Sequence, residues 1–336
     1  MVIEKCGLNS HQMLISLQQA KDPSTMVLVN HSHVTEFFIQ GFSDNPNLQV
    51  PLFFVLLLVY LITVAGNSMV LSVICLDPHL HKPMYLFLLH MSFIDICFTS
   101  VTLPKAMAVH LAKQNAISIA ACTSQLYFFL LFVSTEFLLL TAMAFDRYVA
   151  ICNPLRYSTI MSRRMCAQLA ATSWIISILD AMPHTLLISG LSFCGRQHLN
   201  HFFCDITALS KLACSDTSSM AIITFTIGVL LGISSSMMTV TSYALIIATI
   251  LRIRSAAGRH LAFSTCSAHL TAVLLFYGTA FCNYLRPGAI FNSGEEKLFS
   301  LFFAALIPML NPLIYTLRNK EVKKALQKAC QGKAAI

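Results

Sequence analysis

Long apolar runs alternate with short polar segments along most of this chain. The first of these runs, from Pro51 to Leu76, contains no charged residue. A helix needs about 20 mostly apolar residues to cross a hydrocarbon core of roughly 30 Å, because its backbone groups must pair internally there. Seven runs are long enough. We expect membrane-spanning helices at residues 50–75, 84–108, 120–151, 166–190, 220–251, 263–285 and 298–317.

The composition supports a membrane protein over a soluble one. Of the 336 residues, 56% are hydrophobic and 11% are charged, whereas about 25% are charged in typical soluble domains. The mean hydropathy is +0.71. We therefore predict an all-α membrane protein that folds as a bundle of seven transmembrane helices. The same balance excludes disorder and a nucleic-acid-binding module, so no nucleic-acid partner is expected.

Three regions are expected along the chain. They are an extracellular amino-terminal segment at residues 1–48, the seven-transmembrane bundle at 49–317, and a short amphipathic cytoplasmic helix with a tail at 318–336. In the last region Val322, Leu326 and Ala329 are spaced to form one apolar side, which would lie on membrane lipid. Cys330 beside them is a candidate for palmitoylation.

The basic residues indicate the orientation of the bundle. If the amino terminus lies outside the cell, most of the 22 Lys and Arg fall on the cytoplasmic side, as the positive-inside rule requires. The first 48 residues lack the apolar core of a cleavable signal peptide, so the first span is expected to act as the insertion signal. Asn30, in Asn-His-Ser, would then be correctly placed for N-glycosylation. Either Met1 or Met26 is compatible with the start of translation.

Ten of the twelve cysteines fall into two groups. Half of the twelve lie in or beside spans and are interpreted as small apolar side chains. The outer group is Cys122, Cys194, Cys204 and Cys214, which allow three connectivities. Joining Cys122 to Cys204 would fold the long fourth-to-fifth connection over the mouth of the bundle, and Cys194 with Cys214 would then close a short loop. We favour this pairing, which leaves Cys6 without an evident partner.

The run from His201 to Asp205, which contains Cys204, allows a second interpretation. His, Cys and Asp are all metal-ligand types. A disulfide would remove the thiolate of Cys204, so the disulfide interpretation is preferred and no metal site is predicted there.

Six short motifs occur in a fixed order on the expected sides of the membrane. They are LHKPMY at 80–85, MAFDRYVAIC at 143–152, HFFCD and LACSD in the outer loop, HLAFSTCSAHL at 260–270 and PMLNPLIYTLRNKEVKKAL at 308–326. Together they resemble an odorant receptor of the tetrapod-type (class II) group, within the rhodopsin-like G-protein-coupled receptor family. The resemblance covers about residues 34–328. Phe145 stands where the family usually has Tyr, and the amino terminus is longer than usual.

The resemblance implies a function in olfaction. A small volatile odorant would bind from outside, and a heterotrimeric stimulatory G protein of the olfactory type would bind inside and raise cyclic AMP. The plasma membrane of olfactory sensory neuron cilia is the implied location. The alternative is a receptor of the same class that senses a non-odorant small molecule outside the olfactory epithelium.

Functions of other classes are not favoured by the sequence. A transporter or channel predicts inverted repeats, broken helices or rings of charge, and none of these is evident. A membrane enzyme needs a nucleophile with its base or a metal triad, and no HExxH or GxSxG occurs. No enzymatic activity is therefore expected.

A ligand pocket is expected among the outer parts of the third, fifth and sixth spans. With a rise of 1.5 Å per residue, the third span places its candidates roughly 10–18 Å below Cys122. The candidates in the three spans are Phe129, Leu130, Val133, Ser134, Ile227, Leu231, Tyr277, Ala280, Asn283 and Tyr284. We expect an apolar lining with few hydrogen-bonding groups and no full charge, which suits a small hydrophobic ligand. The family resemblance places Tyr277 at the pocket floor, where it would sense the ligand.

Asp95 and Glu136 are expected to be the two acids that lie deep within spans. Ionised groups at that depth are costly and are functional candidates by default. Both should lie near mid-membrane, with Asn67 and Asn311 as neighbours. The resemblance suggests a site filled by a sodium ion or water, and no other cofactor is expected. The alternative is a pair of acids that share a proton.

The inner ends of the spans are expected to hold an activation switch. Asp146 would pair with Arg147 at rest, and release of Arg147 would open a cleft for a helix of the G protein. The residues assigned to this switch are Asp146, Arg147, Tyr148, Tyr243, His269, Asn311, Pro312 and Tyr315. The basic residues Arg252, Arg254 and Arg259 would face anionic lipid and the G protein.

Overall fold

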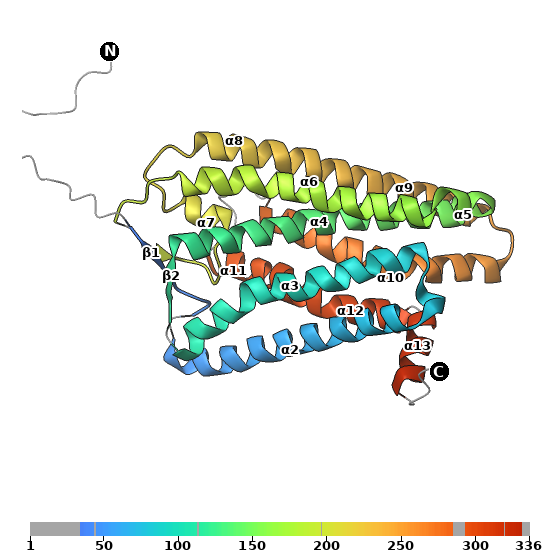
Figure 1. The fold of residues 1–336 in the computed structure, drawn as a ribbon, viewed down its shortest axis with the longest axis horizontal. Coiled ribbons are helices and arrows are strands. Elements are labelled where there is room, and N and C mark those ends of the chain that lie inside the picture. The colour runs from blue at the N-terminus through green and yellow to red at the C-terminus, as the bar shows by residue number, and fades with distance from the viewer. Residues whose placement is uncertain are drawn as a thin grey trace, which may run out of the picture. The chain divides into compact units, whose positions relative to one another are not determined.

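The computed structural model describes residues 34–43, 45–112, 114–195, 197–284, 293–318 and 320–330 (Figure 1). All of these belong to the unit formed by residues 34–336. Asn30, Cys6 and Met26 lie outside the described residues, so the glycosylation site and the start of the chain stay predictions.

Long apolar helices form the bundle, as the sequence predicts. They are α2 (Pro46–Leu76), α3 (Pro83–Ala112), α4 (Ile119–Cys152), α6 (Arg163–Ser189), α8 (Ser218–Ile227) continued by α9 (Ser234–Arg252), α10 (Ala256–Tyr284), and α11 (Ser293–Leu301) continued by α12 (Ile307–Arg318). Two π-helical stretches, Gly228–Ile233 and Phe302–Leu306, join α8 to α9 and α11 to α12. Six of these spans are long and apolar enough to cross a membrane unbroken, and α10, bent by 44°, makes the seventh. The predicted seven-helix membrane bundle is confirmed.

The starts of several helices follow from local sequence. Ser118 accepts a hydrogen bond from the Ala121 amide at the start of α4, and Ser162 accepts one from the Met165 amide at the start of α6. Asn45 caps α2, whose first residue is Pro46. A side-chain cap satisfies a backbone amide that has no partner inside the helix, and proline suits the first helical position because its missing amide would be unpaired there anyway.

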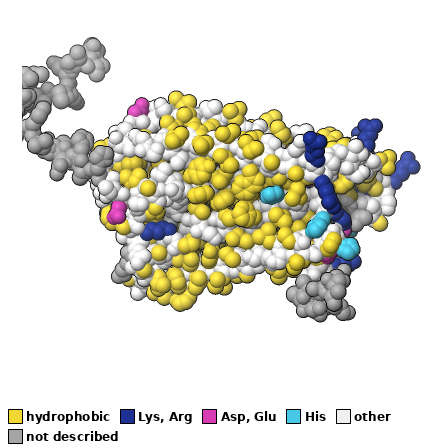
Figure 2. Space-filling view, viewed as in Figure 1, with side chains coloured by type: hydrophobic (Ala, Val, Ile, Leu, Met, Phe, Trp, Pro, Cys, Tyr) yellow, Lys and Arg dark blue, Asp and Glu magenta, His cyan; other side chains and the backbone are white. Residues whose placement is uncertain are grey.

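The surface of the bundle is apolar where lipid would contact it. In α2 the side chains of Phe54 and Leu58 are each 59% exposed. Figure 2 shows hydrophobic side chains over the middle of one face, while most of the Lys and Arg on this face gather at one end. Inside the bundle, α4 is the central helix and packs against α3, α6, α9 and α10.

The chain is not entirely helical, because three short strands lie at one end of the bundle (Figure 1). Strand β1 (Glu36–Ile39) pairs antiparallel with β2 (Ala116–Ser118) and parallel with β3 (His198–Leu199), so that β1 is the central strand. These strands were not predicted, because runs of two to four residues give no clear periodicity. We call this end of the bundle the sheet end, and the opposite end, which carries α13 (Lys320–Cys330), the α13 end.

Two disulfides hold the connection between α6 and α8 at the sheet end. Cys122 of α4 is bonded to Cys204, and Cys194 is bonded to Cys214. These are the two pairs favoured from the sequence. The backbone amide of Cys204 also donates to Oε1 of Gln125 at 2.9 Å, which adds a second link to α4. Because Cys204 uses its sulfur in the bridge, it offers no thiolate to a metal ion.

Candidate ligand-binding site

A cavity of about 420 Å³ lies near the sheet end, between α4, α6, α7 (Ile206–Ser210), α8 and α10. Sites for small molecules typically occupy about 300–1,000 Å³. On α4, residues Phe129, Val133 and Phe137 line it at helical spacing, so they share one face of the helix. The π-helical stretch Gly228–Ile233 contributes part of the opposite wall. Such stretches are frequent at functional sites.

The connection held by the disulfides covers the cavity at the sheet end. Residues Ile206, Thr207 and Ser210 of α7 form part of the lining. Asp205 caps α7 by accepting a hydrogen bond from the Thr207 amide at 2.9 Å. The ring of Phe203 lies 4.8 Å from that of Phe129, so the connection packs directly onto α4.

Seven of the ten predicted pocket residues line this cavity. They are Phe129, Leu130, Val133, Ser134, Ile227, Leu231 and Ala280. Those on α4 could be placed at this depth because they follow Cys122 along one continuous helix that rises 1.5 Å per residue.

The other three predicted pocket residues are not among those that line the cavity. Tyr277 lies beyond its floor, where its hydroxyl donates to the Phe137 carbonyl at 3.3 Å and lies 3.2 Å from the Thr141 hydroxyl. Asn283 accepts a hydrogen bond from Ser300 at 3.1 Å, and Ser300 lies 3.3 Å from Nε2 of His201. The side chain of Tyr284 lies outside the described part of the structure.

Three polar residues that the sequence analysis did not assign also line the cavity: Asp180, His184 and Thr224. The lining was expected to carry no full charge, but it contains an acid, and Asp180 is a third acid deep within a span. Asp180 is only 9% exposed. It could have been found in the fourth span by the rule that identified Asp95 and Glu136, because an acid within an apolar run is unusual.

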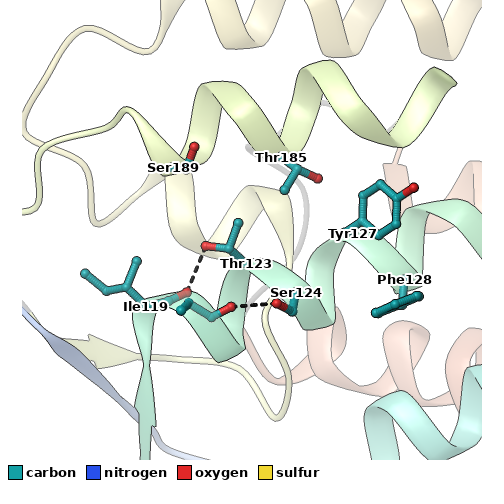
Figure 3. A pocket seen from close by; sticks show the side chains of 8 residues that line it. Ile119, Thr123, Ser124, Tyr127, Phe128, Thr185 and Ser189 are labelled. Carbon is teal, nitrogen blue, oxygen red and sulfur yellow. Dashed lines mark hydrogen bonds between the residues drawn. The ribbon is translucent and has the colours of Figure 1, made fainter. Parts of the chain in front are cut away.

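A second hollow on the same helices has a different character. An open groove lies between the outer faces of α4 and α6, and Figure 3 shows side chains that line it. Its volume is about 560 Å³. Most of its hydroxyl groups already have partners: Thr123 donates to the Ile119 carbonyl, Ser124 to the Ala120 carbonyl and Thr185 to the Ala181 carbonyl. The groove therefore offers few free polar groups, and the cavity is the better candidate for a specific ligand.

The predicted polar residues near mid-bundle do lie together. Nδ2 of Asn311 donates to both carboxylate oxygens of Asp95, at 3.1 and 3.2 Å. Glu136 is close enough to Asn311 and Asp95 to interact with both electrostatically. Nδ2 of Asn67 donates to the carbonyls of Thr63 and Pro308. Its Oδ1 is buried and has no partner among the residues described.

The Asp146 carboxylate at the α13 end is fully engaged by its neighbours. Oδ2 accepts from Nη2 of Arg147 at 2.7 Å and from Nε at 3.1 Å. Oδ1 accepts from the hydroxyl of Tyr157 at 2.8 Å. Tyr157 lies in the short helix α5 (Tyr157–Ile160), where burial and then the charge of Asp146 raise its pKa, so the hydroxyl keeps its proton. The sequence analysis did not identify Tyr157.

The remaining predicted switch residues lie around the same end. The hydroxyl of Tyr243 is 2.7 Å from Nδ1 of His269, which links α9 to α10. The hydroxyl of Tyr315 is buried without a partner in the described part of the chain. Tyr148 packs between two hydrophobic clusters. Pro312 lies close to Gly66 of α2, where an added Cβ would be 3.0 Å from its Cγ.

Comparison with known proteins shows the family. The Olfactory receptor family model matches residues 56–333. Mouse (Mus musculus) olfactory receptor 8U3 is 48% identical over 304 residues, 90% of this chain and 95% of the relative. Human (Homo sapiens) olfactory receptor 13F1 is 49% identical over 303 residues, again 90% and 95%. The chain belongs to the olfactory receptor family.

Membership of this family confirms the resemblance carried by the sequence motifs. This olfactory receptor is a multi-pass membrane protein of the G-protein-coupled class, with odorant ligands and a G protein as partners, and it is not an enzyme. Its described residues contain no group of three His, Cys, Asp or Glu that could hold a metal ion.

In this receptor α13 is attached to the bundle by charge as well as by packing. Val322 was expected to lie on lipid, but it is fully buried in the hydrophobic cluster of the bundle. Nζ of Lys82 lies 2.7 Å from Oε1 of Glu321. The hydroxyl of Tyr85 donates to Oε2 at 2.8 Å. Partial burial raises the pKa of Glu321, but the hydrogen bonds from Lys82 and Tyr85 outweigh this and lower it overall. The side chains of Ala329 and Cys330 lie outside the described residues.

Proposed function

We propose that this olfactory receptor binds small, mostly hydrophobic volatile odorants in the cavity between α4, α6, α7, α8 and α10. One observation supports this assignment most directly: the cavity has a largely apolar lining and lies beneath a connection that Cys122–Cys204 ties to α4. A ligand there would contact α8 and α10, the helices that must move for a cytoplasmic cleft to open.

The proposed orientation places the sheet end outside the cell and the α13 end in the cytoplasm. Exposed basic side chains support this arrangement, because positively charged residues concentrate on the cytoplasmic side of membrane proteins. Those at the α13 end include Arg156, Arg163, Arg164, Arg252, Arg254, Arg259, Lys323 and Lys324. The same surface would attract anionic lipid and the G protein.

Activation would transfer a change from the cavity to the Asp146–Arg147 pair. Phe137 lines the cavity, and its carbonyl is bonded to Tyr277, whose hydroxyl also lies 3.5 Å from that of Thr239 on α9. Tyr277 of α10 therefore contacts both α4 and α9 close to the cavity. An agonist that favours a different position of Phe137 would favour a different packing of α9 and α10.

A sodium ion or a water network is proposed at the mid-bundle polar residues. The oxygen ligands are suitable, because Asp95 and Glu136 are close enough to interact electrostatically and Oδ1 of Asn67 lacks a partner among the described residues. A cation held by these oxygens would balance two nearby carboxylates. If it stabilises the resting state, raising sodium should lower agonist potency, and Asp95→Asn should remove that dependence.

The receptor is proposed to couple to the stimulatory G protein of olfactory neurons and to act at the membrane of their cilia. Cultured cells that express the receptor with that G protein should raise cyclic AMP when given an odorant. Cells lacking all stimulatory α subunits should not respond. A cyclic AMP response that persists without them would refute the coupling.

Antibody access to amino-terminal but not carboxyl-terminal tags on intact cells tests the orientation.

A further inference from the structure

The carboxylate of Asp180 faces the cavity with one of its oxygens unused. Oδ2 accepts a hydrogen bond from the hydroxyl of Ser134 on α4. Oδ1 is buried and has no hydrogen-bond partner among the described residues. Asp180 itself is about nine-tenths buried and belongs to the cavity lining. An oxygen removed from water without a replacement donor is costly, so this site favours an occupant that supplies one.

A second unused polar atom lies on the wall of the same cavity. Oγ1 of Thr224, on α8, is buried and also has no partner in the described chain. Helices α6 and α8 are in contact, so Asp180 and Thr224 belong to neighbouring walls. Two unsatisfied oxygens in one otherwise apolar cavity indicate a position for a polar head group.

His184 adds to the acceptor character of this region. Its Nδ1 lies 2.9 Å from the backbone carbonyl of Asp180, and a carbonyl can only accept, so Nδ1 carries the proton. In the neutral ring Nε2 is then an acceptor. Among the lining residues that the structure describes, none is Lys or Arg. Asp180 therefore has no Lys or Arg beside it, and His184 is the one described lining side chain that could carry a positive charge.

The rest of the lining suits a hydrocarbon body. It includes Phe129, Val133, Ile227, Leu231 and Phe281. A ligand that combined a polar head at Asp180 with an apolar chain along these residues would satisfy both parts of the cavity.

We infer that Asp180 anchors the head group of the agonist, and that the receptor prefers small apolar molecules bearing a hydrogen-bond donor, with protonated amines favoured over alcohols. This inference rests on the proposed function, since it assumes that odorants bind in the cavity. An ammonium group donates hydrogen bonds and also balances the carboxylate. Charge-assisted hydrogen bonds of this kind are about twice as strong as neutral ones. Ser134 acts as a positioning residue, because it engages Oδ2 and leaves Oδ1 toward the ligand.

The test compares ligands that differ only in the head group. Cells expressing the full receptor with a surface tag are given an amine, an alcohol, a ketone and a hydrocarbon of equal chain length, and cyclic AMP is measured over a range of doses. The amine should have the lowest half-maximal concentration, by about tenfold or more relative to the ketone. An equal or stronger response to the ketone or the hydrocarbon overturns the inference.

Substitutions then assign the preference to Asp180. Asp180→Asn should weaken the amine response by about tenfold and the alcohol response much less, because an amide oxygen still accepts a hydrogen bond but carries no charge. Thr224→Val should weaken both responses. Thr185→Val is the matched control on α6, because its hydroxyl is already bonded to the Ala181 carbonyl and it faces the surface groove. It should change neither response.

The outcomes separate this inference from the proposed function. If ketones and hydrocarbons activate the receptor and Asp180→Asn leaves the ranking unchanged, odorant reception stands and the role of Asp180 is refuted. If a receptor that reaches the surface responds to no head group, both are contradicted. If Asp180→Asn does not reach the surface, the wild-type receptor and Thr224→Val still test the inference. It is refuted if the wild type shows no preference for the amine and Thr224→Val leaves the ranking of the ligands unchanged.

Discussion

Two buried aspartates, Asp146 near the α13 end and Asp180 near the sheet end, differ in how completely the protein satisfies them. Both oxygens of Asp146 are bonded, one to Arg147 and the other to Tyr157. Asp180 has only the hydroxyl of Ser134, on one oxygen, among the described residues. A carboxylate with all its partners supplied by the chain stabilises one conformation. A carboxylate with an oxygen left over is available to a ligand.

The comparison suggests that the sheet end binds the ligand and that the α13 end changes conformation in response. Ser134 and Asp146 both belong to α4 and lie 12 residues apart, or roughly 18 Å along the helix axis. Helix α4 is central and well packed, so it is a stable reference against which other helices move. A ligand bound at Asp180 would then shift the equilibrium between conformations that keep the contact of Asp146 with Arg147 and conformations that lose it.

The largest effect is expected from removing Arg147, the ionic partner of Asp146. Arg147→Ala should abolish the cyclic AMP response, because Arg147 is the residue proposed to engage the G protein once Asp146 releases it. Surface expression of a tagged receptor should remain largely intact and is measured in the same cells. An undiminished response at normal surface expression would show that Arg147 has no role in coupling.

A smaller loss of agonist response is expected from reducing the volume of the cavity that Asp180 lines. A Cβ at Gly228, which lines the cavity, would meet no atom within 4 Å, so Gly228→Val should be accommodated in the fold while occupying ligand space. Agonist potency should fall by about tenfold, since a few lost apolar contacts are worth about 1–3 kcal/mol.

The matched control for this change is Gly278→Val on α10. An added Cβ there also meets no atom within 4 Å, but Gly278 does not line the cavity. The potency of the agonist at Gly278→Val should stay near its potency at the wild type. Equal losses in the two variants would mean that helix propensity, and not cavity volume, causes the effect.

The two aspartates also show what the sequence could predict. Asp146 and Arg147 stand in a recognisable motif, and Phe129 to Ser134 could be placed because Cys122 marks the end of a straight helix. Depth in α10 was harder to predict, since the helix starts at Ala256 and bends by 44°, which leaves Tyr277 beyond the cavity floor. Strand β3 has two residues and pairs with β1, which is distant in sequence, so no local pattern reveals it.

A moderate gain of basal activity is expected when Asp146 loses its hydrogen bond from Tyr157. Tyr157→Phe removes the donor to Oδ1 of Asp146 and keeps the ring. An unsatisfied buried acceptor costs about 1–3 kcal/mol, so the resting state should lose stability and basal cyclic AMP should rise several-fold.

Tyr127→Phe is the control for Tyr157→Phe. It makes the same chemical change on α4, in the surface groove near the sheet end. Basal cyclic AMP should remain at the wild-type level in this variant. A basal level in Tyr157→Phe that matches the control would mean that Tyr157 does not stabilise the resting state.

The smallest effect is expected at the exposed contact between Glu321 and Lys82, which belongs to neither aspartate. Its side chains are 52% and 56% exposed, and exposed ion pairs contribute little. The lowered pKa of Glu321 keeps it charged at neutral pH, and the contact weakens only as the pH falls through that pKa. Glu321→Gln should therefore reduce the maximal cyclic AMP response by less than about twofold. Gln327→Ala, at an exposed and uncharged site on the same helix, should leave it unchanged. A loss as complete as that of Arg147→Ala would instead make the attachment of α13 part of the switch.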